Sequence, residues 1–356
     1  MNTFIKNVKV SVVKAPLIQS FRTAKGTHDF LENIFFTITL TDGTKGFGEA
    51  AVAQHITGET IEQTLRHLRS IKNEIIGKEI FDYLAISLSL YGRFSANRCA
   101  IAAVEMALLD ALTRKINVPL WRFFGPSPKK ITSDVTIVIA DLNETEKMTQ
   151  RFFRQGFRAF KIKVGRDFDL DIKRVLLIKK IIRNCEFYID ANQGYSADET
   201  LSFVKTLRRF KAIPSLIEQP VPKKDWEGLK KVTRLSKIAV CADESVSTLV
   251  DANKAIREKA CHAVNIKPMK FGLLQAREVA HLCKANRIKL MMGGMMETSL
   301  AMTASAHLAA GLGYFDFIDL DTPFFIKGKY AGSPYLSHSG TYDLSSAKPG
   351  IGIQFK

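Results

Sequence analysis

Charged residues end short apolar runs at regular intervals in the second half of the chain. Asp190, Glu218, Asp243 and Lys267 close four such runs and are separated by 28, 25 and 24 residues. A strand, a helix and two loops need about this many residues, since a (β/α)8 barrel uses ~250 residues for eight units. Catalytic groups of such barrels lie at the C-terminal ends of the strands. We therefore expect these side chains to meet on one rim.

The three carboxylates predict a metal site. Packed together, they would repel one another and some would be protonated. A divalent cation removes that conflict, and all-oxygen ligation without His or Cys favours Mg²⁺ over zinc. We assign Asp190, Glu218 and Asp243 to one Mg²⁺ per subunit, with Asn192 and Glu244 beside them. The alternative is that each carboxylate caps the helix that follows it.

Three lysines accompany the carboxylates. Lys161 and Lys163 are two residues apart on an expected strand, so both side chains point inward. Lys267 ends the sixth strand, across the barrel from the second. An amine near a cation and other amines is expected to have a lowered pKa, which prepares it to act as a base. Two bases on opposite sides of one carbon permit proton removal from one face and delivery to the other. The alternative for any single lysine is a surface or salt-bridge residue.

The reaction that fits this arrangement is proton abstraction next to a carboxylate. Such a carbon acid is very weak, and a chelated Mg²⁺ would stabilise the enediolate that forms when the α-proton leaves. The site therefore predicts an enzyme that moves protons at carbon.

Eight expected strands alternate with amphipathic helices from about Ser133 onward. Their ranges are 134–139, 158–164, 186–190, 214–218, 238–243, 262–267, 288–293 and 315–319. Eight such units indicate a parallel α/β barrel, with an open doubly wound sheet as the structural alternative.

The segments before and after the repeats predict a second, smaller unit. Residues 1–50 contain three alternating runs, and an Asp42-Gly43 turn joins the second to the third. Residues 60–118 have helical spacing. The tail ends in an alternating run, expected to be a strand that returns to the first domain. We divide the chain into an α+β capping domain (1–125), a barrel domain (126–325) and a C-terminal segment that completes the capping domain (326–356).

The net charge of +17 could indicate a nucleic-acid or membrane partner. The basic residues are spread along the helices without a recognition module, so we expect neither partner and keep a basic nucleic-acid-binding protein as the remote alternative. No apolar run approaches the ~18 residues needed to span a bilayer. The N-terminus lacks an apolar signal core, and the five cysteines show no paired spacing. A cytoplasmic protein with reduced thiols is expected.

The chain resembles members of the enolase superfamily, in particular its muconate-lactonizing subgroup. The resemblance covers nearly the whole chain and rests on Lys161-x-Lys163, DANQGY (190–195), IEQP (217–220), ADES (242–245) and NIKP (265–268). It implies an enolase-like modified TIM barrel in which the three carboxylates bind Mg²⁺. It also implies that Lys163 is the base for the S configuration, that Lys267 is the base for the R configuration, and that Lys161 supports charge on the substrate carboxylate.

The resemblance narrows the reaction through FIDLDTP, near the expected eighth strand. Members of the subgroup catalyse cycloisomerisation, dehydration to o-succinylbenzoate, racemisation of N-acylated amino acids or dipeptide epimerisation. Asp319 and Asp321 resemble the D-x-D motif of dipeptide epimerases, in which the pair holds the α-ammonium group of the substrate. The resemblance thus implies inversion at the C-terminal residue of a dipeptide, with L-Ala-D/L-Glu from cell-wall peptide recycling as the leading substrate. N-succinylamino-acid racemase and o-succinylbenzoate synthase are the alternatives.

Further substrate contacts are expected from several places. Thr136 lies on the first barrel strand, and Glu297 and Thr298 belong to GGMMET near the seventh. Specificity is expected in a capping-domain loop (20–27) that closes over the substrate. Family members acting on L-Ala-D/L-Glu carry an arginine in this loop, whereas this chain has Lys25 there, with Arg22 close by. Lys25 would bind a carboxylate as a point charge. The family often forms symmetric oligomers, which implies a homo-oligomer.

Overall fold

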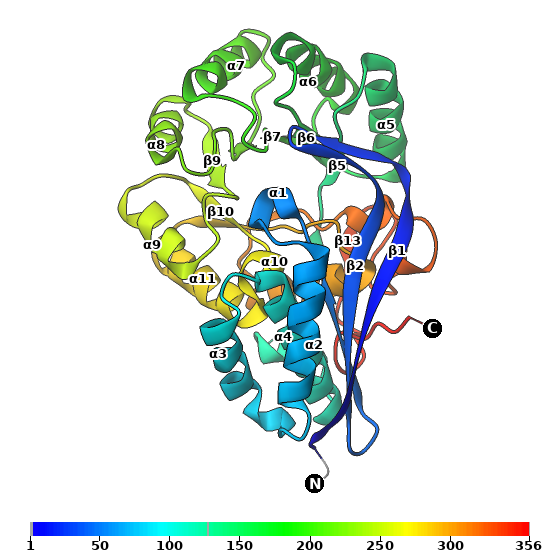
Figure 1. Ribbon diagram of the computed structural model, residues 1–356. Coiled ribbons are helices and arrows are strands. Elements are labelled where there is room, and N and C mark those ends of the chain that lie inside the picture. Colours follow the sequence, from blue (N-terminus) through cyan, green and yellow to red (C-terminus); the bar gives the residue numbers. More distant parts are fainter. Residues whose placement is uncertain (1–2, 127, 356) are drawn as a thin grey trace.

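A curled parallel sheet surrounded by helices forms the larger part of the protein (Figure 1). The computed structural model describes residues 3–126 and 128–355. Its eight parallel strands follow one another in chain order, from β5 to β12. The backbone N–H of Asp134 donates to the carbonyl of Ile318 at 2.8 Å, which brings the first strand to the last. The barrel predicted from the sequence is confirmed.

Every strand of this sheet lies within its predicted range. The strands are β5 (Val135–Ile137), β6 (Ala159–Lys163), β7 (Glu186–Asp190), β8 (Leu216–Glu218), β9 (Ala239–Ala242), β10 (Ala263–Ile266), β11 (Lys289–Met292) and β12 (Phe317–Ile318). They are mainly apolar because both faces of a parallel sheet are covered, and the exceptions include Lys161, Lys163, Asp190 and Glu218 toward their C-terminal ends.

A helix follows each of the first seven strands, and most of these helices begin at a residue whose side chain caps the first turn. They are α5 (Leu142–Gln155), α6 (Phe168–Ile182), α7 (Ala197–Arg209), α8 (Trp226–Leu235), α9 (Leu249–Arg257), α10 (Pro268–Phe271), α11 (Leu273–Ala285) and α12 (Ser299–Leu312). Asp141 and Asp167 accept bonds from first-turn amides, and Ser196 forms a capping box with Glu199. These caps fix where each helix begins, and therefore how each strand end is placed.

Apolar side chains fill the barrel interior directly beneath the charged residues at its mouth. Tyr188, Leu216 and Cys241 each lie two residues before a predicted metal ligand and belong to one buried cluster. Side chains two apart on a strand share a face. The rim residues therefore stand on a packed, dry floor.

The N-terminal unit is a three-stranded antiparallel sheet covered by helices. It contains β1 (Ile5–Thr23), β2 (Gly26–Leu40), β3 (Lys45–Ala50), α1 (Gln54–Thr57), α2 (Ile61–Ile75), α3 (Tyr83–Arg93) and α4 (Arg98–Lys115), with short 3₁₀ turns at Ile80–Asp82 and Leu120–Phe123. Helix α4 is buried on nearly all sides.

Helix α4 approaches β3 closely because glycines line the contact. A Cβ atom on Gly48 would lie 1.9 Å from the carbonyl oxygen of Ala103. We expect Gly48→Ala to destabilise the protein by about 1–3 kcal/mol, because β3 and α4 must separate. Chemical denaturation measures this, with Gly92→Ala as control, since a Cβ at that helical position meets no atom within 4 Å. Equal stability of the two variants would contradict the close-packing argument.

The segment 20–27 is not the loop that we expected. Strands β1 and β2 stay paired up to Thr23 and Gly26, after a register shift between Pro16 and Phe21. They form a long ribbon that runs from the N-terminal helices to beside β5 and β6 (Figure 1). The N–H of Ile139 donates to the carbonyl of Arg22 at 3.0 Å, which ties the ribbon to the barrel. The hairpin extends past the predicted strand ends because pairing resumes at Phe21 and His28 after the register shift.

The C-terminal segment also differs from its prediction. It contains 3₁₀ turns at Thr322–Phe324 and Lys329–Ala331 and the short strand β13 (Thr341–Tyr342), which pairs with β4 (Ile131–Thr132). The strand expected at its end does not form in residues 350–355. Instead, the N–H of Ile351 donates to Asp110 at 2.6 Å and Phe355 stacks on Phe35. The segment returns to the N-terminal unit through these contacts, and the three-part division of the chain stays a prediction.

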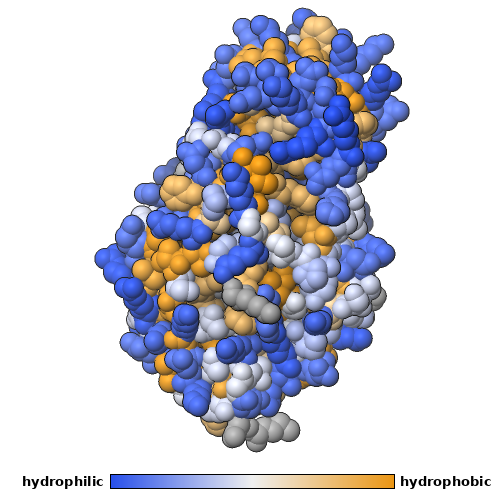
Figure 2. Space-filling model, turned by 90° about the vertical axis from the view of Figure 1, so that its right-hand side faces the viewer, coloured by the Kyte–Doolittle hydropathy of each residue, from blue (hydrophilic) through white to orange (hydrophobic). Residues whose placement is uncertain are grey.

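The outer surface carries the excess positive charge. Hydrophilic side chains cover most of the face in Figure 2, with hydrophobic patches between them. Among the described residues, no helix is both long and apolar enough to cross a membrane.

Candidate active site

Charged side chains from several strands of the barrel meet at its mouth. Each is at most 8% exposed, although each carries a charge. They are Lys161, Lys163, Asp190, Glu218, Asp243, Lys267 and Asp319. Charged groups are almost never buried unless they are paired, so the pairing pattern shows how this cluster is held.

Lys161 lies at the centre of the cluster. Its Nζ is 2.7 Å from both Asp319 and Glu218 and 3.1 Å from Asp190. Burial opposes the charged amine, but the three carboxylates outweigh it and hold the pKa of Lys161 well above its ordinary value. Lys161 is therefore a fixed cation that links three strand ends.

Lys163 and Lys267 face one cavity from opposite sides of the barrel. They come from β6 and from the end of β10, four strands apart in the sheet of eight. Lys163 is 2.6 Å from Asp190, and Lys267 is 2.6 Å from Asp243. Both line the same cavity. The expected pairing of two opposed amines is thus present in the fold.

Among the protein's own groups, Lys267 does not have the lowered pKa expected for an amine near a cation. Burial alone would lower it, but Asp243 and Glu218 outweigh burial and raise the pKa of Lys267. The expectation assumed that a cation had already neutralised these carboxylates. With the carboxylates free, they stabilise the ammonium form.

The three predicted metal ligands come from neighbouring strands. Asp190 and Glu218 end β7 and β8, and Asp243 follows β9. Burial, reinforced by the charge of Asp190, raises the pKa of Glu218 to about 7. Burial likewise raises the pKa of Asp243, but Lys267 and Lys270 outweigh it and hold that pKa below its usual range. The carboxylates repel one another, as the sequence predicted, and lysines partly compensate.

Unpartnered oxygens beside this group fit a hard cation. Both carboxylate oxygens of Glu244 and the side-chain oxygen of Asn192 are buried without a hydrogen-bond partner among the described residues. Burial and the charge of Asp243 raise the pKa of Glu244 to about 7. An all-oxygen donor set of this kind suits Mg²⁺. A second acidic group, Asp134 with Asp319 and Asp321, also has the spacing to hold a metal ion.

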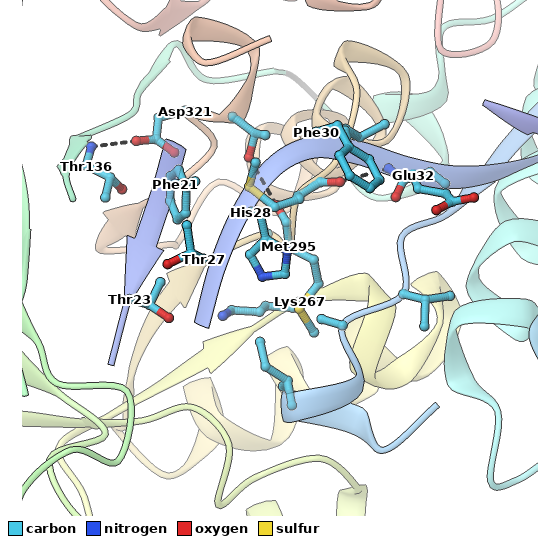
Figure 3. Close-up of a pocket in the computed structure, with 18 of the residues that line it drawn as sticks. Phe21, Thr23, Thr27, His28, Phe30, Glu32, Thr136, Lys267, Met295 and Asp321 are labelled. Atoms are coloured by element: carbon cyan, nitrogen blue, oxygen red, sulfur yellow. Dashed lines mark hydrogen bonds between the residues drawn. The ribbon is translucent and has the colours of Figure 1, made fainter. Parts of the chain in front are cut away.

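The cavity has a charged floor and a wall that mixes apolar residues with polar ones such as Thr23, Thr27 and His28. Its volume is about 320 Å³, and both domains line it. The barrel contributes Lys163, Lys267, Asn192, Thr136, Asp319 and Asp321, among others. The capping domain and the loop after β11 contribute Phe21, Phe30, Val52, Ile56, Met295 and Met296, among others. Figure 3 shows side chains from β1, β2 and the barrel around one common space.

Thr136 and Asp321 belong to this cavity as one unit. The backbone N–H of Thr136 donates to Asp321 Oδ2 at 2.5 Å (Figure 3). Burial, together with the neighbouring Asp319, raises the pKa of Asp321 to about 7. The D-x-D pair therefore stands where a cationic ligand group would relieve its repulsion.

Four other expected substrate contacts lie away from the described lining of the cavity. Arg22 pairs with Glu144 at 3.3 Å in a separate pocket, and Lys25 lies at the hairpin turn. Glu297 is buried and accepts the N–H of Met295 at 2.7 Å. Thr298 caps α12. Glu297 and Thr298 thus support the loop that lines the cavity.

Sequence reasoning missed several residues of the charged cluster. Asn265 donates to Glu218 at 2.7 Å, and Lys270 donates to Asp243 at 2.7 Å. Both had a signal: Asn265 lies two residues before Lys267 on the same strand face, and Lys270 lies one helical turn after it. Asp134, next to the D-x-D pair, was missed as well.

Glu49 is a further missed residue, and it joins the two domains behind the cavity. It lies on β3, is fully buried, and accepts from Thr298 N at 2.8 Å, Thr298 Oγ1 at 2.5 Å and Asn33 Nδ2 at 2.6 Å. Asn33 also donates to the carbonyl of Met296 at 2.8 Å. Glu49 thereby fixes Asn33 and Met296, which both line the cavity.

We expect Glu49→Gln to raise KM severalfold and to lower stability by about 1–3 kcal/mol. The NH₂ group of glutamine would face the N–H and O–H groups that now donate to the carboxylate, and could not accept from them. Glu59→Gln is the matched control. Glu59 is also buried in the capping domain and accepts from Arg98 N and Cys99 N, and it is not among the residues described as lining the cavity. Steady-state kinetics and melting curves of both variants check this. An unchanged KM for Glu49→Gln, or the same rise in both variants, would contradict the positioning role.

The fold and this site define a barrel enzyme with a capping domain, in which buried lysines and carboxylates face a cavity lined by both domains. Residues 5–125 match the N-terminal domain model of the mandelate racemase / muconate lactonizing enzyme family, and residues 144–356 match the enolase C-terminal domain-like family. The chain belongs to the enolase superfamily and is an enzyme of the isomerase class.

Proteins named for their activity align with nearly the whole chain. A hydrophobic dipeptide epimerase from Citrifermentans bemidjiense is 45% identical over 98% of this chain and 97% of its own length. The solved substrate complex of the L-Ala-D/L-Glu epimerase from Bacillus subtilis is 31% identical, covers 98% of both chains and has a TM-score of 0.94. A dipeptide epimerase from Enterococcus faecalis, solved with Mg and L-Leu-L-Tyr, is 29% identical over 99% of this chain and 100% of its own, with a TM-score of 0.93.

Proposed function

We propose that the protein is a Mg²⁺-dependent dipeptide epimerase that inverts the α-carbon of the C-terminal residue. The observation that carries the proposal is the cavity in which Lys163 and Lys267 stand opposite each other while Asp319 and Asp321 lie at one side. Two opposed amines suit a reaction that exchanges a proton across one carbon. Two carboxylates suit a substrate with a free ammonium group.

Each lysine acts on one face of the substrate carbon. Lys163 removes the α-proton from the S configuration, and Lys267 removes it from the R configuration. The lysine on the opposite face then donates a proton, which inverts the centre. The base must be neutral and its partner protonated, so the pair exchanges roles when the reaction runs backward.

The substrate carboxylate is the anchor next to the reacting carbon. Lys161 holds a positive charge beside it, since its amine stays protonated among Asp190, Glu218 and Asp319. Asp190, Glu218 and Asp243 would hold Mg²⁺, which when bound supplies the charge that stabilises the enediolate form of the substrate. Burial of Lys163 and Lys267 limits the water near the proton transfer.

An apolar C-terminal residue fits the apolar part of the cavity wall better than glutamate does. Phe21, Val52 and Ile56 line it, whereas Arg22 pairs with Glu144 in another pocket. The 45% identical relative is a hydrophobic dipeptide epimerase, and the Enterococcus enzyme was solved with L-Leu-L-Tyr. L-Ala-D/L-Glu, on which relatives 32% and 33% identical act, is the second candidate.

The test is a panel of L-Ala-L-Xaa dipeptides separated by chiral chromatography. We expect the largest kcat/KM for Leu, Met, Phe or Tyr at the second position, and at least a tenfold lower value for Glu, since Phe21, Val52 and Ile56 offer a carboxylate no hydrogen bond. A preference for Glu would overturn the assigned side chain, and no turnover of any dipeptide would overturn the proposed function.

We also propose a cellular location, a pathway and an oligomeric state for the enzyme. The five cysteines are all free, which suits the reducing cytoplasm. Recycling of cell-wall peptides and a homo-oligomeric state stay predictions.

A further inference from the structure

A third carboxyl group stands beside the D-x-D pair. Asp134 directly precedes β5 and is 1% exposed. Neither of its carboxyl oxygens has a hydrogen-bond partner among the described residues. Nearly all buried polar groups in folded proteins are partnered, so a group like this points to a ligand.

The spacing of the three carboxyl groups matches one small cation. One oxygen from each of Asp134, Asp319 and Asp321 lies within 4.8 Å of the others. Three points spaced in this way all lie within about 2.8 Å of a common centre, which is the usual length of an N⁺–H···O⁻ hydrogen bond. Three acceptors around one centre match an ammonium group, which has three N–H donors.

The known partners of the pair leave this role open. Lys161 bonds Asp319 Oδ2 at 2.7 Å, and the N–H of Thr136 bonds Asp321 Oδ2 at 2.5 Å. A carboxylate accepts several hydrogen bonds, so both groups keep capacity for a ligand. Asp134 lies two residues before Thr136, so the two side chains are expected on the same face of the chain, and Asp134 is buried. Thr136, Asp319 and Asp321 line the cavity, and Asp134 is within reach of the last two without being among the residues described as lining it.

We propose that Asp134 is the third acceptor for the α-ammonium group of the substrate, completing the site made by Asp319 and Asp321. This inference rests on the proposed dipeptide substrate. The ammonium group enters from the cavity side and directs its third N–H toward the barrel interior, where Asp134 receives it. A metal ion in this position is the competing ligand, but Mg²⁺ needs oxygens at about 2.0–2.1 Å, and Lys161 already places a cation against Asp319.

The test compares two ligands that differ only in the ammonium group. These are an L-Ala-L-Xaa dipeptide and its desamino analogue, the N-propanoyl amino acid. Their affinities for the wild type and for Asp134→Asn are measured by calorimetry at fixed Mg²⁺. We expect the variant to bind the dipeptide at least about tenfold more weakly, the effect of losing one charge-assisted hydrogen bond. Affinity for the analogue should change by less than about twofold.

Asp110→Asn is the matched control. Asp110 is also fully buried and accepts backbone N–H groups, those of Phe47 and Ile351, but it belongs to α4 and is not among the residues described as lining the cavity. It should change both affinities alike. Asp134→Ser replaces the first variant if melting curves show that the amide does not fold.

Three outcomes overturn the proposal. Asp134→Asn could weaken both ligands equally, which would make Asp134 structural, or it could leave dipeptide affinity unchanged. Alternatively, equilibrium dialysis with Mg²⁺ could find two ions per wild-type chain and one per variant chain, which would assign the site to a metal. If the wild type epimerises no dipeptide, the proposed function fails, and the affinity comparison still decides the role of Asp134.

Discussion

Removing either opposed lysine is expected to abolish epimerisation while leaving proton exchange on one substrate enantiomer. Lys267→Ala retains Lys163, so it should exchange the α-proton of a substrate with an L residue at the C-terminus. Lys163→Ala should exchange only the substrate with a D residue. Inversion should fall by at least about 10³-fold in both variants, since one positioned acid or base contributes 10²–10⁴-fold and inversion needs both.

Nuclear magnetic resonance in D₂O measures exchange and inversion together for these variants. Lys205→Ala, at an exposed position of α7, controls for the loss of a lysine elsewhere on the barrel. A mirror-image pattern between the two variants supports one base per face. Wild-type inversion in either variant, or loss of exchange for the same enantiomer in both, would contradict the assignment.

Removing the metal is expected to have the second large effect. Chelation should reduce activity to background, and added Mg²⁺ should restore it, because Asp190, Glu218 and Asp243 repel one another and the reaction places further negative charge next to them. Bound Mg²⁺ should also stabilise the fold, by about 2.7 kcal/mol at a concentration 100 times its Kd. Thermal melting with and without Mg²⁺ measures this second effect.

The variant Glu218→Gln distinguishes loss of a metal ligand from loss of any buried carboxylate. Glu218 is a predicted ligand, whereas Glu105 is a similarly buried carboxylate that accepts the N–H of Leu274 in the first turn of α11. Metal analysis should find Mg²⁺ lost from Glu218→Gln and retained in Glu105→Gln. Full activity in a chelated protein that contains no metal would contradict the metal-dependent mechanism.

The barrel was predictable from the sequence because its signals are local and repeated. Each strand is a short apolar run, and a charged residue such as Asp190, Glu218 or Lys267 marks where it ends. The two-residue spacing of Lys161 and Lys163 also predicted a shared inward face, and both side chains are buried. Periodicity within a few residues carried this information.

The elements that were predicted incorrectly depend on contacts between distant parts of the chain. The ribbon of β1 and β2 extends beyond its predicted ends because pairing resumes after the register shift near Pro16. This extension decides where Arg22 and Lys25 lie. The alternating C-terminal residues form no strand in the part described because the chain there bonds α4 through Asp110 instead of a neighbouring strand.

The missed site residues have the same explanation. Glu49 meets Thr298, which lies 249 residues away, and no local pattern announces that contact. In the sequence, Asp134 has no feature that distinguishes it from other residues at the start of a strand. Only the fold brings Asp319, which follows β12, close to it. The position of Asn265 could have been predicted from its spacing to Lys267. The hydrogen bond that its side-chain amide donates to Glu218 shows that side chains alternate between faces on β10 as on β6.

The central claim is that one proton is exchanged across the α-carbon by two opposed bases. The most direct measurement incubates the Mg²⁺-loaded wild type with an L-Ala-L-Xaa dipeptide of apolar Xaa in D₂O and follows the α-position by nuclear magnetic resonance. We predict that the inverted L-Ala-D-Xaa product carries deuterium at the α-carbon from its first appearance. An inverted product that keeps the original proton, or no inversion of any such dipeptide, would contradict the account.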